Sequence, residues 1–285
     1  IEAPPDLAVI VVPAASVASV VRQCAQVGVK AAVIVSAGFK EVGEAGARHE
    51  RQVVEGARRR KMRVLGPNSL GLIVPDRKLN ASFVPDMPRA GGIGYFSQSG
   101  ALLSAILDHA AATDLGFSRV VSIGNKADVD ELDVMRELAA DPTTRVIAGY
   151  LEHIEAGAAF VREAERMSAS KPIVLLKAGG TEAGAAAATS HTGSLVTREA
   201  VYESAFERAG VIRVGSVREQ LAVASALASQ PLPRGGAVAV VTNAGGAGIL
   251  AADAIERARL TPAEFEPTTV STLEAALPAE AKVGN

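Results

Sequence analysis

Short runs of β-branched and aliphatic residues alternate with helix-period patterns along most of this 285-residue chain. Parallel strands need a crossover between them, and a helix is the usual crossover, so the alternation favours parallel sheets with helices on both faces. A chain of this length commonly forms about two domains. The pattern therefore predicts an α/β fold built from more than one parallel-sheet domain.

The predicted elements fall into three sets, and Pro67 and Pro75 mark a loop region after the first. The second and third sets look like related flavodoxin-type units. We therefore expect domains over residues 1–86, 87–215 and 216–285. The predicted strands are 7–12, 31–35, 63–65, 93–96, 117–122, 146–151, 173–176, 211–214 and 237–241. The predicted helices are 16–27, 45–60, 101–112, 131–139, 156–167, 199–208, 217–228 and 247–258.

Composition excludes several classes of protein. The net charge of −2 provides no general basic surface, so nucleic acid is not an expected partner. The basic run from Arg58 to Lys61 is interpreted as complementing the C-terminal end of a helix. The single cysteine, Cys24, excludes a disulfide within the chain. No apolar run approaches the ~20 residues of a membrane span, and no leader pattern opens the chain, so we expect a cytoplasmic location.

The segment from Ala185 to Leu195 places one imidazole, that of His191, among small residues just before a predicted helix. Small residues let a bulky anion approach the backbone, and Thr192 and Ser194 add hydroxyls beside the free N–H groups of the helix start. A neutral imidazole is a nucleophile that can take up a phosphoryl group and pass it on. The segment predicts a phosphohistidine site; the alternative is a surface histidine in an alanine-rich loop.

Two strand-to-helix turns carry polar and small residues. In open parallel sheets, ligands bind at the carboxyl ends of the strands, where such turns lie. In the turn from Gly66 to Gly71, Asn68 offers amide donors to a ligand, although a plain turn is the alternative. In the next, Ser97-Gln98-Ser99-Gly100, two hydroxyls meet a helix start. This second turn predicts an anion cradle, with helix N-capping as the alternative.

A third turn, from Thr242 to Gly248, also follows a strand and opens a helix. It resembles a phosphate loop without the Walker lysine, and we interpret it as an anion or interface site. Neither G-x-G-x-x-G at that spacing nor G-x-x-x-x-G-K-[ST] occurs, which argues against a self-contained dinucleotide or P-loop site. Ser99 lacks the flanking glycines of a G-x-S-x-G elbow, so a serine hydrolase is also unsupported.

Glu152 follows the predicted strand 146–151. A carboxylate at a strand's carboxyl end can accept a ring N–H from a catalytic imidazole, which fixes the tautomer and stabilises positive charge. A solvated strand end is the alternative. Gly124 and Asn125 end another strand and predict a turn that lines the same cleft.

Together these motifs resemble the acyl-CoA synthetases that form a nucleoside diphosphate, a family that includes the alpha subunit of succinyl-CoA synthetase and the ADP-forming acetyl-CoA synthetases. The resemblance covers nearly the whole chain. The stretch from Gly124 to Asp128 and the appended third unit look closer to the ADP-forming acetyl-CoA type. The motifs that carry the resemblance are Gly66-Pro67-Asn68 with Gly71, Ser97-Gln98-Ser99-Gly100, Ser122 to Asp128, Glu152, Ser190 to Ser194 and Thr242 to Gly246.

The resemblance implies a partial Rossmann-like CoA-binding domain followed by flavodoxin-like domains. It also implies a phosphohistidine relay, in which His191 carries the phosphoryl group and Glu152 supports it. The phosphohistidine would lie between two helix N-termini. The residues implied to bind phosphate are Ser97, Ser99, Gly100, Thr192, Gly193 and Ser194. Those implied to bind the cofactor, around the CoA thiol end, are Gly66, Asn68, Gly124 and Asn125.

The implied ligands are CoA, inorganic phosphate and a small carboxylic acid, with ATP or ADP and Mg²⁺ bound by an ATP-grasp module. No metal ligands are expected on this chain itself. The sequence begins after the strand and glycine-rich loop that hold the nucleotide part of CoA in this family, and we recognise no ATP-grasp stretch. We therefore expect a segment truncated at both ends, inactive alone, that works with an ATP-grasp domain or subunit, in an oligomer.

Two alternatives stay open at this point. One family of protein lysine acetyltransferases fuses the same architecture, as a regulatory sensor, to an acetyltransferase domain. Those regulatory halves often lack the active histidine, so the presence of His191 with Glu152 favours the ligase. The other alternative is a CoA-responsive scaffold without chemistry, in which His191 would not become phosphorylated.

Overall fold

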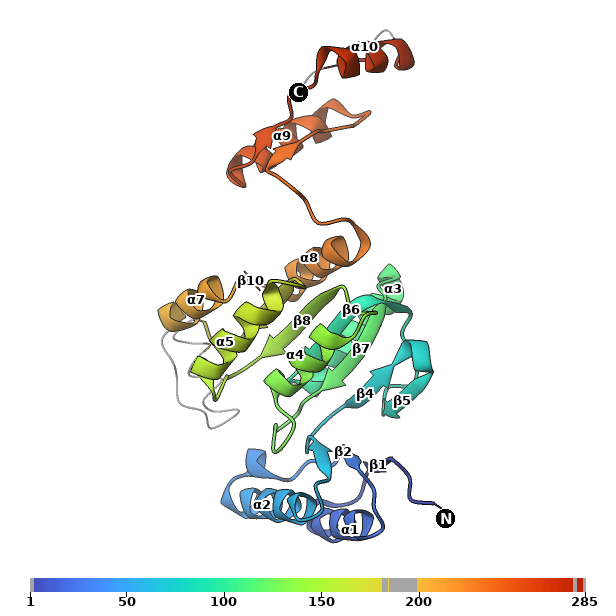
Figure 1. Ribbon diagram of the computed structural model, residues 1–285, viewed down its shortest axis with the longest axis vertical. Helices are drawn as coiled ribbons and strands as arrows, with labels where there is room; N and C mark the ends of the chain where they lie inside the picture. Colours follow the sequence, from blue (N-terminus) through green and yellow to red (C-terminus); the bar gives the residue numbers. More distant parts are fainter. Residues whose placement is uncertain (1–2, 181–183, 185–198, 279–280, 284–285) are drawn as a thin grey trace. The chain divides into compact units, whose positions relative to one another are not determined.

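The computed structural model describes residues 3–180, 184, 199–278 and 281–283 (Figure 1). The chain divides into two compact units, Ile1–Gln230 and Pro231–Asn285. Within the described ranges, none of the helices combines the length and the apolar character needed to cross a membrane.

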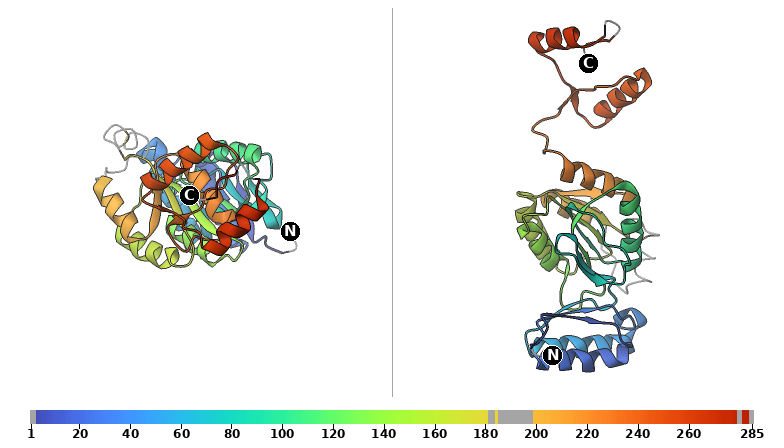
Figure 2. Two further views of the ribbon diagram at one scale, coloured as in Figure 1. Left: turned by 90° about the horizontal axis from the view of Figure 1, so that it is seen from above. Right: turned by 90° about the vertical axis from the view of Figure 1, so that its right-hand side faces the viewer.

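The first described strands of unit 1 form a parallel sheet in the order β1-β2-β3. Two helices pack side by side against one face of this sheet, as Figures 1 and 2 show. Val17, Ile34 and Val53 are fully buried between these layers. The elements are β1 Leu7–Ile10, α1 Ala14–Gln26, β2 Ala31–Ile34, the short 3₁₀ helix η1 Lys40–Val42, α2 Glu44–Arg58 and β3 Arg63–Leu65.

The described part of unit 1 also holds a seven-stranded sheet in the order β10-β9-β8-β6-β7-β4-β5. Its parallel strands are β6 Ala90–Ser97, β7 Phe117–Ser122, β8 Val146–Leu151, β9 Ile173–Lys177 and β10 Val211–Val214. Numbered along the chain, these five have the order 2-1-3-4-5, which is the flavodoxin-like order. The chain reverses direction across the sheet between β6 and β8, so ligands are expected where these two strands end.

The loop region predicted around Pro67 and Pro75 is in part a β-hairpin, and that prediction was wrong. Strands β4 (Gly71–Val74) and β5 (Leu79–Ser82) pair antiparallel at the sheet edge. On its other side, β4 pairs antiparallel with β7. Pro75 opens the 3₁₀ turn η2 (Pro75–Arg77) between them. The N–H at the first position of such a turn has no partner within the turn, so proline loses no hydrogen bond there. Pro75 therefore fits the hairpin turn without disrupting a strand.

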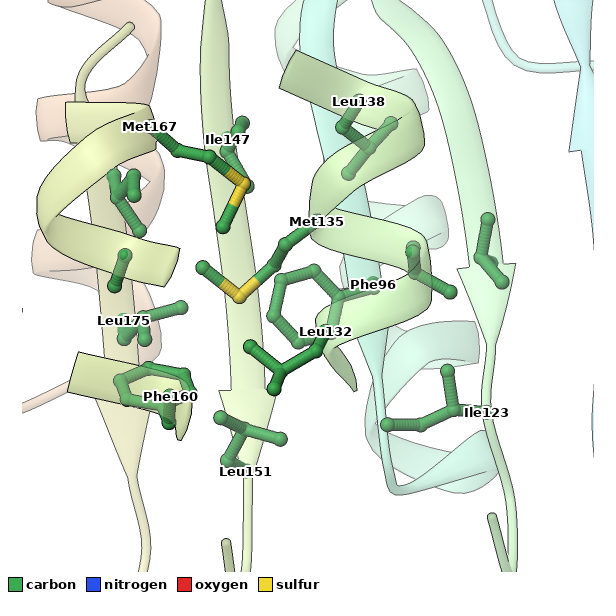
Figure 3. Close-up of a cluster of buried hydrophobic side chains, with 14 of the residues drawn as sticks. Phe96, Ile123, Leu132, Met135, Leu138, Ile147, Leu151, Phe160, Met167 and Leu175 are labelled. Carbon is green, nitrogen blue, oxygen red and sulfur yellow. The ribbon is translucent and has the colours of Figure 1, made fainter. Parts of the chain in front are cut away.

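Helices cover both faces of the seven-stranded sheet. One face carries α3 Gly100–Thr113 and α8 Val217–Ser229, and the other carries α4 Glu131–Ala140, α5 Gly157–Ser168 and α7 Glu199–Arg208. Figure 3 shows how Met135 from α4 and Met167 from α5 meet Ile147 of β8. Each such buried side chain contributes about 1.5 to 3 kcal/mol to folding. The predicted α/β architecture is therefore confirmed.

Helix α8, which the sequence pattern assigned to the third set, packs against β6, β8 and β9. Its fully buried Gln220 accepts a hydrogen bond from Tyr95 Oη (2.7 Å). The Gln220 amide nitrogen donates to the carbonyl oxygens of Gly149 (2.7 Å) and Val174 (3.1 Å). These bonds satisfy a polar side chain that has no contact with water, and they anchor the helix on three strands.

Unit 2 contains a short parallel pair, β11 (Ala237–Val238) and β12 (Thr261–Pro262). Helix α9 (Gly245–Arg257) starts within the predicted glycine turn, as expected. The sequence pattern did not predict β12 or the last helix, α10 (Pro267–Ala276).

Candidate active site

A cavity of about 720 Å³ lies within unit 1, where the carboxyl ends of β2 and β3 meet those of β6, β7 and β8. It includes the point at which the strand order reverses. Its lining residues are Val35, Ala37, Lys40, Glu41, Asn68, Ser69, Leu70, Phe83, Gln98, Ser99, Gly100, Ala101, Ser104, Gly124, Asn125, Glu152 and His153.

The cavity brings together six residues that the sequence analysis singled out. Gly66 and Ser97 are not among its lining residues. His191, Thr192, Gly193 and Ser194 lie outside the described residues. The six residues that it does bring together are Asn68, Ser99, Gly100, Gly124, Asn125 and Glu152.

The loops after β3 and β7 contact each other through their backbones. Gly124 adopts φ +52°, and a Cβ there would lie 2.3 Å from the Pro67 carbonyl oxygen. The backbone N–H of Asn125 donates to the same Pro67 oxygen (2.9 Å). Gly66 is similarly restricted, because its Cβ would lie 2.6 Å from the Ile34 carbonyl oxygen. Gly66 and Gly124 thus shape this wall through the space that they leave.

Asn125 is the centre of a polar network on this wall. Its amide nitrogen donates to Glu41 Oε2 (2.6 Å) and to Glu50 Oε2 (2.8 Å), and its oxygen faces Asn68 Nδ2 at 3.4 Å. Glu41 and Glu50 were not expected at this site from the sequence, and they lie 84 and 75 residues before Asn125. No motif marks them, since their role arises only when the two sheets meet.

The Glu41 carboxylate is held in its ionised form. Burial by itself would raise its pKa, but hydrogen bonds from Asn125 and from the backbone N–H groups of Phe39 and Gly38 outweigh burial, so the pKa lies below its usual value. Glu41 Oε1 accepts from Gly38 N at 2.6 Å and from Phe39 N at 3.0 Å.

The turn after β6 engages both of its hydroxyls within the chain. Ser97 is fully buried, and its Oγ donates to the Ser99 carbonyl (2.7 Å) and accepts from the Ser99 N–H (3.1 Å). Ser99 caps α3 by accepting from Leu102 N at 3.2 Å. The N-capping alternative thus describes Ser99, and Ser97 is not among the residues that line the cavity. Gly100 and Ala101 present the first turn of α3 to the cavity, where backbone N–H groups suit an anion.

The loop after β8 carries Glu152, which is half-buried at the cavity. Gln98 holds this loop, because its Oε1 accepts from Glu152 N (3.0 Å) and His153 N (3.3 Å). Gln98 Nε2 lies 2.8 Å from His153 Nδ1. Burial, together with the positive charges of Lys126 and Lys40, lowers the pKa of His153 to about 4, although Glu155 opposes this shift.

A buried ion pair supports the same loop. Lys126 Nζ lies 2.9 Å from Glu131 Oε2, with side chains 2% and 5% exposed. The same ammonium group donates to the carbonyl oxygen of His153 at 3.0 Å. Neither Gln98 nor His153 was expected as a site residue from the sequence, although each directly neighbours a residue that was.

Comparison with known proteins supports this description. Residues 1–75 match the family described as CoA binding domain, and residues 90–227 match the succinyl-CoA ligase like flavodoxin domain. The alpha subunit of acetate–CoA ligase (ADP-forming) II from Pyrococcus furiosus is 42% identical over 280 residues, which are 98% of this chain. The chain belongs to the NDP-forming acyl-CoA synthetase family. The resemblance stated from its motifs is confirmed.

Other members of the NDP-forming acyl-CoA synthetase family agree in sequence and fold. The 4-hydroxybutyrate–CoA ligase (ADP-forming) of Nitrosopumilus maritimus is 40% identical over 91% of this chain. A dinucleotide-forming acetyl-coenzyme A synthetase 1 from Ca. Korarchaeum cryptofilum, solved with phosphate and ADP, matches 99% of the chain with a TM-score of 0.93 and 38% identity. The chain spans 61% of the length of the Pyrococcus furiosus alpha subunit, 38% of the Nitrosopumilus maritimus ligase and 61% of the Ca. Korarchaeum cryptofilum synthetase chain.

Proposed function

We propose that this chain is the part of an ADP-forming acyl-CoA synthetase that binds CoA and carries a phosphohistidine. The complete enzyme would be an acid–thiol ligase that interconverts acyl-CoA, phosphate and ADP with free acid, CoA and ATP. The observation that carries the proposal is one cavity in which the CoA-binding domain contributes Asn68 and the flavodoxin-like domain contributes Ser99 and Glu152. Two domains that meet at the reversal point of the sheet fit a transfer between two ligands.

The reaction would run in three balanced steps. Phosphate attacks the thioester carbonyl, so that an acyl phosphate forms and the CoA thiolate leaves. A nitrogen of His191 then attacks phosphorus, releasing the carboxylate, and ADP finally takes the phosphoryl group to give ATP. Glu152 would accept the second ring N–H of His191 and stabilise the positive charge of the phosphorylated ring. The first turn of α3 would bind the phosphoryl oxygens.

The cavity suits the thiol end of CoA and a small acid. Its volume falls within the usual range for a small-molecule site. Leu70, Val35 and the 65% exposed Phe83 supply apolar surface, while Asn68 supplies an amide group. The acid would be a small carboxylic acid of the kind named in the relatives, acetate or 4-hydroxybutyrate.

The nucleotide and its Mg²⁺ would bind to an ATP-grasp partner, either a further domain or a separate subunit, within an oligomeric enzyme of the cytoplasm. One relative is itself an alpha subunit, which supports a partner of this kind. The relatives described above are named as ligases or synthetases, and this favours the ligase over the regulatory half of a lysine acetyltransferase.

The test is phosphorylation of His191. The complete gene product, with its nucleotide-binding partner if that is separate, is incubated with ATP and Mg²⁺ and analysed by intact mass for acid-labile phosphate. We expect one phosphoryl group in the wild type and none in His191→Asn. His109→Asn is the matched control, since His109 is exposed on α3 and should leave the phosphate in place. A wild type that never carries phosphate would support the sensor or scaffold instead.

A further inference from the structure

The orientation of the Gln98 side chain is fixed by its partners. Two backbone N–H groups, those of Glu152 and His153, point at one atom of its carboxamide. An N–H can only donate, so that atom is the oxygen, and the NH₂ group therefore faces His153 Nδ1 at 2.8 Å. Gln98 also donates its own backbone N–H to the Tyr150 carbonyl oxygen (3.0 Å).

This orientation determines the protonation state of His153. An amide nitrogen has no acceptor capacity, so Nδ1 must accept and the single ring proton must be on Nε2. Nε2 faces Glu155 Oε1 at 3.3 Å, which is suited to accept that proton. The nearby Lys126 and Lys40 ammonium groups and burial oppose a second proton, and Glu155 only partly offsets them. His153 is therefore a neutral hydrogen-bond acceptor toward Gln98.

Lys126 holds the other side of the same residue. Its Nζ donates to the His153 carbonyl oxygen (3.0 Å) and is itself fixed by Glu131 (2.9 Å). The peptide groups before and after His153 are thus bound from two different strand ends, after β6 and after β7.

We propose that Gln98, His153 and Lys126 form a clamp of positioning residues that holds the loop after β8, so that the carboxylate of Glu152 stays at the cavity. This inference rests on the proposed function, because it gives Glu152 the task of supporting His191. A misplacement of about 1 Å in a reacting group can cost roughly 100-fold in rate, so the fixed loop would contribute to catalysis by holding Glu152 in place.

The clamp itself is tested by NMR, independently of activity. The full chain is labelled with ¹⁵N-histidine, His153 is assigned from the signal lost in His153→Asn, and its tautomer is determined in wild type and in Gln98→Glu. We expect the Nε2–H tautomer and a neutral ring at pH 6 in wild type. In Gln98→Glu the carboxylate can only accept, so Nδ1 should gain a proton, while His109 serves as the unaffected reference. A His153 ring that is charged at pH 6, or that does not respond to Gln98→Glu, would overturn the clamp.

The positioning role is tested by the rate of His191 phosphorylation in the complete enzyme. His153→Leu removes the acceptor and should slow phosphorylation roughly 10- to 100-fold at saturating ATP, with KM for ATP unchanged. His153→Asn keeps an acceptor oxygen near the place of Nδ1 and should retain most of the rate. Equal rates in both variants and wild type would overturn the positioning role. A wild type without phosphate would refute the proposed function instead, and the NMR measurement would still decide the clamp.

Discussion

The two sides of the cavity are fixed in different ways. On the side of the loops after β3 and β7, backbones touch directly, and Gly124 leaves no space for a Cβ beside the Pro67 carbonyl. On the side of the loops after β6 and β8, the side chain of Gln98 bridges the gap. The first arrangement depends on close backbone contact, supported by the hydrogen bonds of Asn125, whereas the second depends on which groups of Gln98 and His153 carry protons. Substitutions should therefore affect the two sides differently.

Lys126 joins the two sides, and its loss should have the largest effect. Lys126→Met leaves the carboxylate of Glu131 buried and unpaired, which should lower the free energy of unfolding by about 3 to 5 kcal/mol in urea titration. Adding Glu131→Leu should recover much of that loss. Lys30→Met, which breaks the exposed pair with Asp6, is the control and should leave the urea midpoint unchanged. If the double variant is no more stable than Lys126→Met alone, the pairing of Lys126 with Glu131 is contradicted.

Gly124→Ala tests the side fixed by shape. The new Cβ would overlap the Pro67 carbonyl in a backbone with φ +52°, so unfolding should become easier by roughly 2 to 4 kcal/mol. Gly157→Ala is the matched control, because nothing beyond its chain neighbours and its own helix backbone lies within 4 Å of its Cβ position. If the two variants are equally stable in thermal and urea unfolding, the loops after β3 and β7 can move apart with little loss of folding free energy.

Asn125→Leu tests the polar network between the two domains of unit 1. Removal of the amide leaves the carboxylates of Glu41 and Glu50 without their shared donor, at a cost of about 2 kcal/mol at pH 7. Because the pKa of Glu41 is lowered in the folded state, its stabilisation is complete above the unfolded pKa of about 4.3 and is lost as the pH falls through the folded value.

The stability of Asn125→Leu should accordingly fall less steeply than that of wild type as the pH is lowered from about 5 to about 3, the range around and below the unfolded pKa. Glu55→Gln, at an exposed pair with Arg59, is the control and should follow the wild-type curve. If the dependence of stability on pH is the same in Asn125→Leu as in wild type, the Asn125 amide does not stabilise the ionised Glu41 carboxylate.

Ser99 gives the smallest expected effect and separates two roles. Ser99→Ala removes the N-cap of α3 and should cost about 1 kcal/mol, whereas Ser99→Gly should cost only a few tenths. If the hydroxyl serves only as a cap, phosphorylation of His191 should be normal in Ser99→Gly. A large loss of phosphorylation in that variant would show that the hydroxyl also binds the phosphoryl group. Ser271→Ala, at an exposed position inside α10, is the control for stability.

Much of the fold follows from sequence pattern because the strands of unit 1 are short, apolar and separated by clear helical periods. The β4–β5 hairpin escaped prediction because prolines usually end elements, and Pro75 here opens a turn. The gathering of Asn68, Ser99 and Glu152 could be expected, since the carboxyl ends of parallel strands lie on the same side of a sheet.

The polar network could not be predicted in the same way. Glu41 and Glu50 lie in no motif, and the motif that contains Gln98 gave no reason to expect its bonds to the loop after β8. The partners that matter here, Asn125 and Glu152, lie 54 to 84 residues away from them in the chain. Ser97 illustrates a different case: its position in the turn suggested a ligand contact, and among the described residues its hydroxyl bonds to Ser99, so its phosphate role stays a prediction. The roles of the residues around His191 stay predictions.

The contact between Phe96 and Gly149 on adjacent strands has an evolutionary consequence. A Cβ at position 149 would lie 2.3 Å from the Phe96 ring. The absence of a side chain at Gly149 therefore leaves the room that the ring occupies. Neither position can change alone without a clash or a void. Across related genes the two should vary as a pair, with a larger residue at 149 accompanied by a smaller one at 96, and single changes should be rare.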